Sequence, residues 1–319
     1  MHPTTVAGIL RQAALDAPDV TALVHGTPDR AGRRRWTYAE LAAEASSLAA
    51  ALGGVFAAGE RVAVWAPSLP ESLVVTYAAA MASLVLVPVN PALRAAEVAH
   101  VLRQSDAAGL FLVPRVRDND LTATLGSIRH ELPDLRHVIA LGGPEWAEFV
   151  GGPAERAGRG TEPGPGRGPE PADVAQLIYT SGTTGVAKGA LLTHGGMTNA
   201  ARLGAERFGI RPGDVYVHTM PLHHVGGQVV AFQICQRRAT AVLLEAFDPA
   251  LLLALIEQEQ ATLTCGVPTM LLALIEHHDR SGRDLSSLRT VSGGGSVVPP
   301  ELVRHIEDTL DVQFTVVFG

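Results

Sequence analysis

Short apolar runs rich in β-branched residues alternate along the chain with stretches whose apolar residues recur at helical spacing. This alternation is typical of parallel sheets whose strands are joined by crossover helices. The pattern therefore predicts an α/β fold with wound, mostly parallel sheets. The expected strands span residues 61–65, 84–88, 109–113, 137–141, 174–180, 215–220, 239–244, 263–267, 288–291 and 313–318.

Helical patterns fill the intervals between these runs, and capping residues mark several helix starts. Thr37-Tyr-Ala-Glu40 forms a capping box, and Asp248 precedes Pro249 at another start. The uncharged stretch Ser72–Leu93 is interrupted at residues 88–91, which favours a buried helix and strand over a membrane span. The expected helices span residues 1–16, 37–52, 71–83, 95–104, a segment ending near 132, 195–208, 229–235, 249–258, 269–277 and 300–310.

Residues 151–171 stand apart from this alternation. They contain seven glycines and five prolines in 21 positions, and they show no apolar periodicity. Such a composition is typical of a linker or a long surface loop. We therefore expect a first α/β subdomain over residues 1–150 and a second over residues 172–319.

The composition is that of a well-filled globular protein. Of 319 residues, 47% are hydrophobic and 18% are charged, which excludes disorder of the whole chain. The formal net charge of −7 argues against binding to a nucleic-acid backbone. One basic group, Arg30 with Arg33, Arg34 and Arg35, has no interleaved aromatic residues and is expected in a solvated loop.

The number of cysteines and the first residues of the chain indicate the cellular compartment. Two cysteines, Cys235 and Cys265, cannot build a disulfide framework. The chain opens with a mixed amphipathic helix instead of a basic and then apolar leader. We expect a cytoplasmic protein without a membrane span.

The sharpest chemical feature is Tyr179-Thr-Ser-Gly-Thr-Thr-Gly-Val-Ala-Lys-Gly189, which follows an apolar strand. Glycines let backbone N–H groups approach an oxyanion, hydroxyls add rotatable donors, and a lysine supplies a mobile charge. Lys188 is the only lysine in the chain. A turn with an incidental lysine is the alternative, but the strand, the hydroxyl density and the spacing favour a phosphate-binding loop. The position of Lys188 excludes a Walker A loop.

Other catalytic signatures are missing from the sequence. It has no G-x-S-x-G, no H-E-x-x-H and no G-x-G-x-x-G that opens a helix, so hydrolase, zincin and dinucleotide-binding interpretations lack support. We interpret His277, His278 and Asp279 as the end of a helix and not as a metal site. No metal-ligating residue is expected.

The loop and several other segments resemble one known family. Residues 180–189 are similar to the TSGTTGxPKG signature of the adenylate-forming superfamily, which includes acyl-CoA synthetases, aryl-acid ligases, luciferases and peptide synthetase adenylation domains. Ala187 stands where the family usually has proline. Residues 292–296 stand where the family has its adenine loop, and there Gly295 and Ser296 replace the family's usual Ala-Pro. The other matching segments, in the family's order, are Trp36–Leu41, Leu86–Pro91, Met220–Gly227, Gly266–Thr269 and Ser292–Ser296.

The resemblance implies a two-step reaction. A carboxylate attacks the α-phosphorus of ATP to form an acyl-adenylate, and a thiol then displaces AMP. The cofactors implied are ATP, Mg²⁺ and CoA, the substrate is a small fatty or aryl carboxylic acid, and the acceptor is CoA or a carrier thiol. Because two anions must meet, donors that gather the triphosphate lower the barrier.

The same resemblance implies which residues form the site. The phosphate loop contributes Thr180, Ser181, Gly182, Thr183, Thr184, Gly185 and Lys188, with Lys188 and Thr184 as catalytic residues. The nucleotide site is completed by Gly293, Gly294, Gly295 and Phe318. The acyl pocket is lined by His224, Gly226 and Gly227.

The fold class also predicts where these residues lie. We expect residues 180–189 to form a loop between a strand and the following helix, with Lys188 directed into a cleft. His224, Gly293–Gly295 and Phe318 are expected around one concavity at the C-terminal edge of the sheet, where open α/β folds bind ligands.

The family pattern continues past the last two residues, Phe318 and Gly319, with an acidic residue and a C-terminal lid domain. The expectation is a C-terminally truncated chain that is inactive alone and whose strand 313–318 forms an open sheet edge. A catalytically dead fragment that binds nucleotide or a partner is one alternative, and a peptide synthetase-type adenylation domain is another. Residues 88–91 and 224–227 look more like those of acid–CoA ligases.

Overall fold

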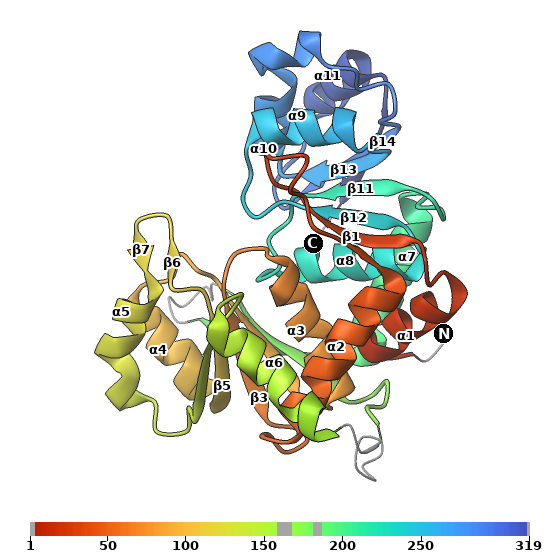
Figure 1. The fold of residues 1–319 in the computed structure, drawn as a ribbon. Helices are drawn as coiled ribbons and strands as arrows, with labels where there is room; N and C mark the ends of the chain where they lie inside the picture. Colours follow the sequence, from red (N-terminus) through yellow and green to blue (C-terminus); the bar gives the residue numbers. More distant parts are fainter. Residues whose placement is uncertain (1–3, 158–167, 181–186, 318–319) are drawn as a thin grey trace. The chain divides into compact units, whose positions relative to one another are not determined.

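The structure is a computed structural model that describes residues 4–157, 168–180 and 187–317 (Figure 1). The chain forms two compact units. The first comprises residues 1–12, 40–200 and 222–225, and the second comprises residues 13–39, 201–221 and 226–319. Each unit has its own sheet and its own buried core.

A six-stranded sheet organises the first unit, in the order β10-β9-β4-β3-β5-β8. Neighbouring strands are parallel except β9 and β10, which are antiparallel. The strands are β3 Arg61–Trp65, β4 Val85–Val89, β5 Ala107–Leu112, β8 His137–Ala140, β9 Val174–Thr180 and β10 Lys188–Thr193. The helices are α3 Pro70–Met81, α4 Ala95–Gln104, α5 Leu121–Ile128, the short η1 Arg129–Glu131 and α6 Pro144–Ala157. A small hairpin joins β6 Arg115–Val116 to β7 Asn119–Asp120.

The core of the first unit forms where amphipathic helices pack on apolar strands. In α4, Val98 and Leu102 are buried, whereas Glu97 and Arg103 on the other side are exposed. The buried residues join Leu110 of β5 in one cluster. Parallel strands are covered on both faces, which explains why they read as nearly continuous apolar runs.

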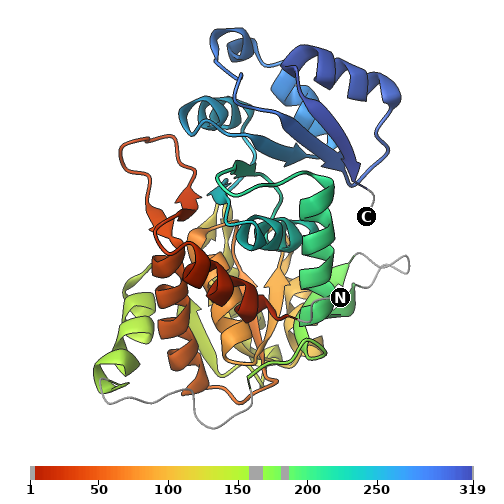
Figure 2. The same cartoon turned by 90° about the vertical axis from the view of Figure 1, so that its right-hand side faces the viewer.

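A seven-stranded sheet organises the second unit, in the order β15-β14-β13-β11-β12-β1-β2. Only the β1–β2 pair is antiparallel among the described pairs of this sheet. The strands are β1 Thr21–His25, β2 Arg35–Thr37, β11 Val215–His218, β12 Thr240–Leu243, β13 Leu263–Gly266, β14 Thr290–Gly294 and β15 Gln313–Val317. The helices are α8 Val225–Gln236, α9 Pro249–Gln258, α10 Pro268–Ile275, the short η2 His278–Gly282 and α11 Pro300–Leu310 (Figure 2).

The two faces of the seven-stranded sheet differ in chemistry. One face carries Val291 and Phe314, which join apolar residues of α9, α10 and α11 in a buried core. Strand pairing aligns Cys265, Ser292 and Thr315 with one another. Because side chains alternate along a strand, these three lie on the opposite face. All three are buried, so this face of the sheet carries a buried row of polar side chains.

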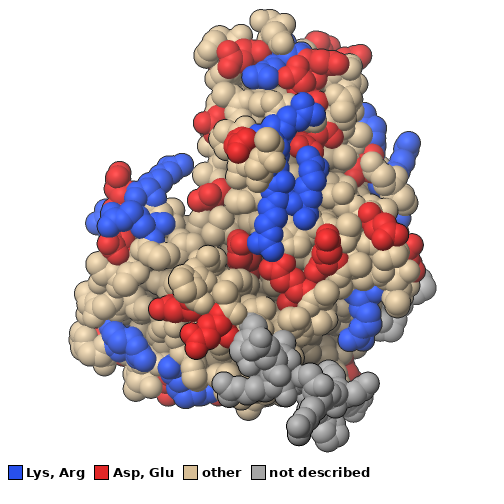
Figure 3. Space-filling model, viewed as in Figure 1, with Lys and Arg blue, Asp and Glu red and all other residues tan. Residues whose placement is uncertain are grey.

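The boundaries between the units fall within α1 Val6–Asp16, α2 Tyr38–Gly53 and α7 His194–Arg207, in the segment before α8, and at the start of α8. Within the described residues, no helix has the length and apolarity needed to cross a bilayer. Acidic and basic side chains are intermixed on the face shown in Figure 3.

The expected α/β class with mostly parallel sheets is confirmed. Several elements have the expected bounds, among them β3, α4 and β9. Five described strands were not predicted: β1, β2, β10 and the two short strands β6 and β7. Helix α6 also continues to Ala157, so the first part of segment 151–171 is helical and not a loop.

The units divide the chain differently from the expected boundary at residues 151–171. Strand β1 pairs with β12, which places residues 13–39 in the second unit. Strand β9 pairs with β4, which places residues 172–200 in the first. Both pairings are distant in sequence, so local composition does not reveal them.

The basic group near residue 33 is a correction to the expected solvated loop. The side chain of Arg33 is fully buried, and its Nη1 lies 2.7 Å from Oε1 of Glu259. Arg35 contacts the same carboxylate at 2.7 Å. The guanidinium of Arg34 lies 4.2 Å from the ring centroid of Trp36. The group therefore joins the β1–β2 region to the end of α9.

Candidate functional site

Strands β9 and β10 hold the two ends of the proposed phosphate loop opposite each other. Thr180, the last residue of β9, pairs with Lys188, the first residue of β10. Both are exposed. Since β9 runs parallel to β4, this pair lies at the carboxyl edge of the six-stranded sheet. The intervening Ser181, Gly182, Thr183, Thr184 and Gly185 lie outside the described residues.

The local structure after the loop corrects one expectation. Lys188 and Gly189 belong to a strand, and α7 begins only at His194. The segment therefore connects the two strands of a hairpin, not a strand and a helix. The Leu177 side chain of β9 lies over Gly189, where a Cβ would be 2.7 Å from its Cδ1. A larger residue at position 189 would therefore displace the end of that side chain.

Helix α4 supports the base of the hairpin. The Nε2 atom of His100 donates to the carbonyl oxygen of Ala187 at 3.1 Å. The His100 ring also meets the ring of Tyr179 edge to face, with centroids 6.4 Å apart. Burial, and then the charge of Asp106, raise the pKa of Tyr179. These contacts fix the residues that directly precede Lys188 and Thr180.

In the second unit, Gly293, Gly294 and Gly295 lie at the carboxyl end of β14. A Cβ on Gly294 would lie 2.1 Å from the carbonyl oxygen of Val317, and one on Gly293 would lie 2.6 Å from the Phe314 ring. Gly295 has a φ of +78°. Packing and conformation therefore explain all three glycines without a ligand. Phe318 lies outside the described residues.

The proposed acyl-pocket residues lie just before α8 and in its first turn. His224 is exposed, and α8 begins at Val225. A Cβ on Gly227 would lie 2.0 Å from the carbonyl oxygen of Pro221, so the tight entry into α8 requires glycine. Burial, and then the neighbouring His224, lower the pKa of His223 to about 4.

The sequence analysis missed a buried histidine near this segment. His218, at the carboxyl end of β11, donates from Nε2 to the carbonyl oxygen of Gly227 at 2.9 Å. Burial lowers its pKa, which favours the neutral form of the ring. No local sequence pattern marks this residue, because its burial and its contact with Gly227 arise only when the fold brings the segments together.

Further polar contacts were also not predicted. The hydroxyl of Thr219 donates to the carbonyl oxygen of Cys265, and the hydroxyls of Tyr216 and Ser292 lie 3.3 Å apart. Burial, and then Cys265, raise the pKa of Tyr216 well above its usual value. A hydrogen-bonded set thus lies under the carboxyl edge of the seven-stranded sheet.

The candidate residues are distributed over both units. Thr180, Lys188 and His224 belong to the first, whereas Gly226, Gly227 and Gly293–Gly295 belong to the second. Thr180 ends β9 and Lys188 begins the antiparallel β10, Gly293–Gly295 lie at the carboxyl end of β14, and the other predicted residues that the structure describes lie at the start of α8. Their convergence around one concavity stays a prediction.

A pocket of about 460 Å³ lies at the opposite edge of the six-stranded sheet. Its lining includes Arg61, Val85 and Val174, at the amino ends of three strands, together with Asp173 and His194. Burial lowers the pKa of His194 to about 4. The pocket is therefore separate from the edge that carries Thr180 and Lys188.

A sequence profile of the AMP-binding enzyme family matches residues 10–319. The chain belongs to this family. It is 34% identical over 290 residues to a feruloyl-CoA synthase of an Amycolatopsis species, covering 89% of this chain and 54% of that protein. It is 32% identical over 299 residues to the indoleacetate–CoA ligase of Aromatoleum aromaticum, covering 93% and 56%.

The fold agrees with this membership. The solved N-terminal domain of FACL13 from Mycobacterium tuberculosis superposes with a TM-score of 0.86 at 25% identity, over 99% of this chain and 75% of that one. The chain spans little more than half the length of the two curated relatives.

Proposed function

We propose that this AMP-binding chain is the larger part of an ATP-dependent acid–CoA ligase. The reaction would activate a fatty or aryl carboxylic acid as an acyl-adenylate and pass the acyl group to CoA. The observation that carries the proposal is the Thr180–Lys188 pair at the carboxyl edge of a parallel sheet. The names of two relatives, a feruloyl-CoA synthase and an indoleacetate–CoA ligase, support aromatic acids as the first class to test.

The described residues at this edge fit a phosphate group. An exposed hydroxyl and the chain's only ammonium side chain lie on paired residues of two strands. Hydroxyl and ammonium groups are strong donors to phosphoryl oxygens. ATP would supply the adenylyl group that activates the acid. Mg²⁺ and CoA belong to the proposed reaction, and we assign no residue of this chain to either.

The chain's own residues would act mainly by electrostatics. Lys188 would neutralise negative charge on the triphosphate, and the Thr180 hydroxyl would donate to the same group. The contact from His100 to Ala187 would keep Lys188 in position while charge develops. Donors whose backbone is held beside the phosphate lower the barrier because they need little rearrangement during the reaction.

The test is acid-dependent ATP–pyrophosphate exchange, measured on the 319-residue chain and on the longest product of its reading frame. Fatty, aryl and amino acids are compared. In the form that exchanges, Lys188→Ala should lower the rate by about 100-fold or more. Arg304→Ala, a change at an exposed arginine of α11 in the second unit, is the matched control and should leave the rate unchanged.

The outcomes separate the alternatives. Exchange with amino acids alone would replace the proposal with a peptide synthetase-type adenylation domain. ATP binding without exchange in either form would favour a nucleotide-binding fragment. A rate that Lys188→Ala leaves unchanged would overturn the role of the loop.

A further inference from the structure

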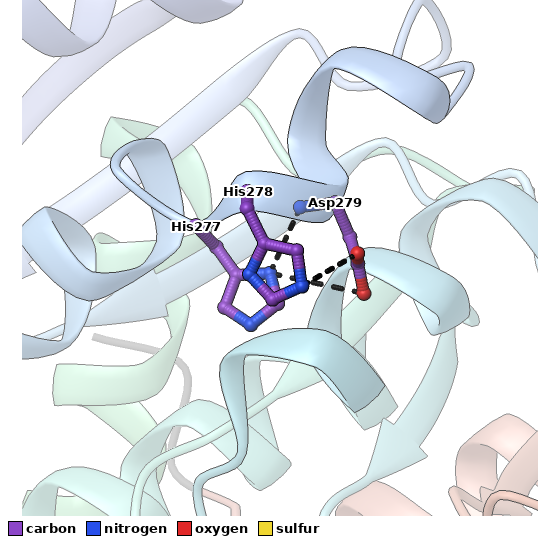
Figure 4. A group of neighbouring side chains, drawn as sticks. All are labelled: His277, His278 and Asp279. Atoms are coloured by element: carbon purple, nitrogen blue, oxygen red, sulfur yellow. Dashed lines mark hydrogen bonds and ion pairs between the residues drawn. The ribbon is translucent and has the colours of Figure 1, made fainter.

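Three potential metal ligands meet in the turn that follows α10 of the second unit. Helix α10 ends at Ile275, and the short η2 begins at His278. Figure 4 shows the side chains of His277, His278 and Asp279 gathered at this turn. Each offers one ligand atom, and these atoms all lie within 4.8 Å of one another.

The contacts among the three side chains are close. The Nε2 atom of His278 lies 3.1 Å from Oδ1 of Asp279, and Nδ1 of His277 lies 3.9 Å from Oδ2 of the same carboxylate. The two imidazole rings stack with centroids 4.5 Å apart. The sequence pattern suggested the end of a helix, but the helix stops before these residues.

Backbone contacts fix the turn itself. The N–H of Asp279 donates to Nδ1 of His277 at 3.3 Å. The Nε of Arg280 donates to the carbonyl oxygen of Ile275 at 2.7 Å. The His277 side chain is only 18% exposed, whereas that of His278 is 85% exposed. His277 is therefore held by the fold, and ligation through its Nδ1 would replace the 3.3 Å contact from the Asp279 N–H, because that nitrogen has one lone pair. The exposed His278 can rotate onto an ion at little cost.

We propose that His277, His278 and Asp279 bind one divalent transition-metal ion, with Zn²⁺ as the best match. Two imidazole nitrogens and one carboxylate oxygen form a donor set typical of zinc, and water can complete a tetrahedron. Hard cations such as Mg²⁺ prefer an all-oxygen set. The site therefore discriminates against Mg²⁺.

The ion would stabilise the second unit without taking part in the proposed reaction. The turn follows α10, whose Leu271, Leu274 and Ile275 belong to the buried core. It precedes the amino end of β14, whereas Gly293–Gly295 lie at the other end of that strand. An ion that joins residues 277–279 ties the exit of α10 to η2, and ligand binding to the native state stabilises it.

Calorimetric titration of the metal-stripped 319-residue chain tests the site. We expect one equivalent of Zn²⁺ to bind and to raise the unfolding temperature. Mg²⁺ should produce neither effect. His278→Ala and the milder His278→Gln should both remove the bound equivalent and the temperature shift. His130→Ala, at an exposed histidine of the first unit, is the matched control and should bind like the parent chain.

A second measurement distinguishes the proposed site from adventitious binding of the metal at other surface histidines. Co²⁺ in a tetrahedral site gives intense visible absorption, which Asp279→Asn should weaken. No binding of Zn²⁺, or equal binding by the parent chain and both His278 variants, would overturn the proposal. If His130→Ala lost the bound Zn²⁺ and His278→Ala kept it, the ion would belong to another site. That result would also overturn the proposal.

Discussion

At the scale of single residues, the tight turn into α8 requires glycine at position 227. The carbonyl oxygen of Pro221 occupies the space that a Cβ would need, at 2.0 Å. The carbonyl oxygen of Gly227 accepts the hydrogen bond from His218. A glycine that resembles a binding residue in the sequence therefore has a structural reason for its place.

We predict that Gly227→Ala destabilises the protein by about 3 kcal/mol, because backbone atoms must move to relieve the overlap. Gly126→Ala is the matched control, since position 126 lies within α5 and nothing approaches its missing Cβ within 4 Å. That change should stabilise by about 0.5–1 kcal/mol through helix propensity. Urea unfolding measures both, and equal effects would contradict the packing argument.

The sequence located part of the candidate site at this scale. It placed Gly293–Gly295 at a strand end, because an apolar run stops there and glycines follow. It could not find His218 or Thr219, since their partners are distant in sequence and a buried histidine leaves no local pattern. Nor could it show that Gly227 is required by Pro221.

At the scale of elements, Glu259 joins the β1–β2 region to the end of α9. Its side chain is 6% exposed and contacts both Arg33 and Arg35. Burial raises the pKa of Glu259, but hydrogen bonds from Arg35 and Arg33 outweigh burial and lower the pKa overall. Arg33 also donates to the side chain of Gln258 at 2.7 Å.

Arg33→Ala should cost about 3 kcal/mol, because it removes the buried partner of a buried carboxylate. Arg35→Ala is the matched comparison, since that side chain is 46% exposed, and its loss should cost less than about 1 kcal/mol. Denaturant unfolding of both variants is the measurement. A larger loss in Arg35→Ala would reverse our assignment of the dominant contact.

Helices and central strands were predictable as elements because their patterns are local. Helix α9 begins after Asp248, whose side chain accepts from the N–H of Leu251 at 2.9 Å, as its sequence indicates. Strand β10 was missed for the opposite reason. It lies at a sheet edge with exposed residues from Lys188 to Leu191, so it lacks the alternation that marks a half-buried strand.

At the scale of the whole molecule, each of the two units has a buried apolar cluster among its described residues. The core of the first unit contains Leu110, and the core of the second contains Val217, and both side chains are fully buried. The sequence predicted two α/β parts but not their composition. Residues 13–39 join the second unit through β1, and only long-range pairing reveals this.

Leu110→Ala should raise hydrogen exchange in β3, β4 and β5 more than in the seven-stranded sheet. Val217→Ala should do the reverse in β11, β12 and β13. Each change removes about 2–5 kcal/mol of packing from one core, and local opening follows local stability. Mass spectrometry of exchanged peptides measures the difference. Equal increases in both sheets for either variant would show a single cooperative core.

The partnership of β1 with β12 also bears on how the protein is made. Thr240 donates to the carbonyl oxygen of Thr21, 219 positions earlier in the chain. At about 5–20 residues per second, roughly ten to forty seconds of translation separate these two strands. During that interval Thr21–His25 has left the ribosome without β12, its parallel neighbour. Slower translation lengthens the time in which a chaperone, or another nascent chain, can bind the β1 edge that β12 later covers.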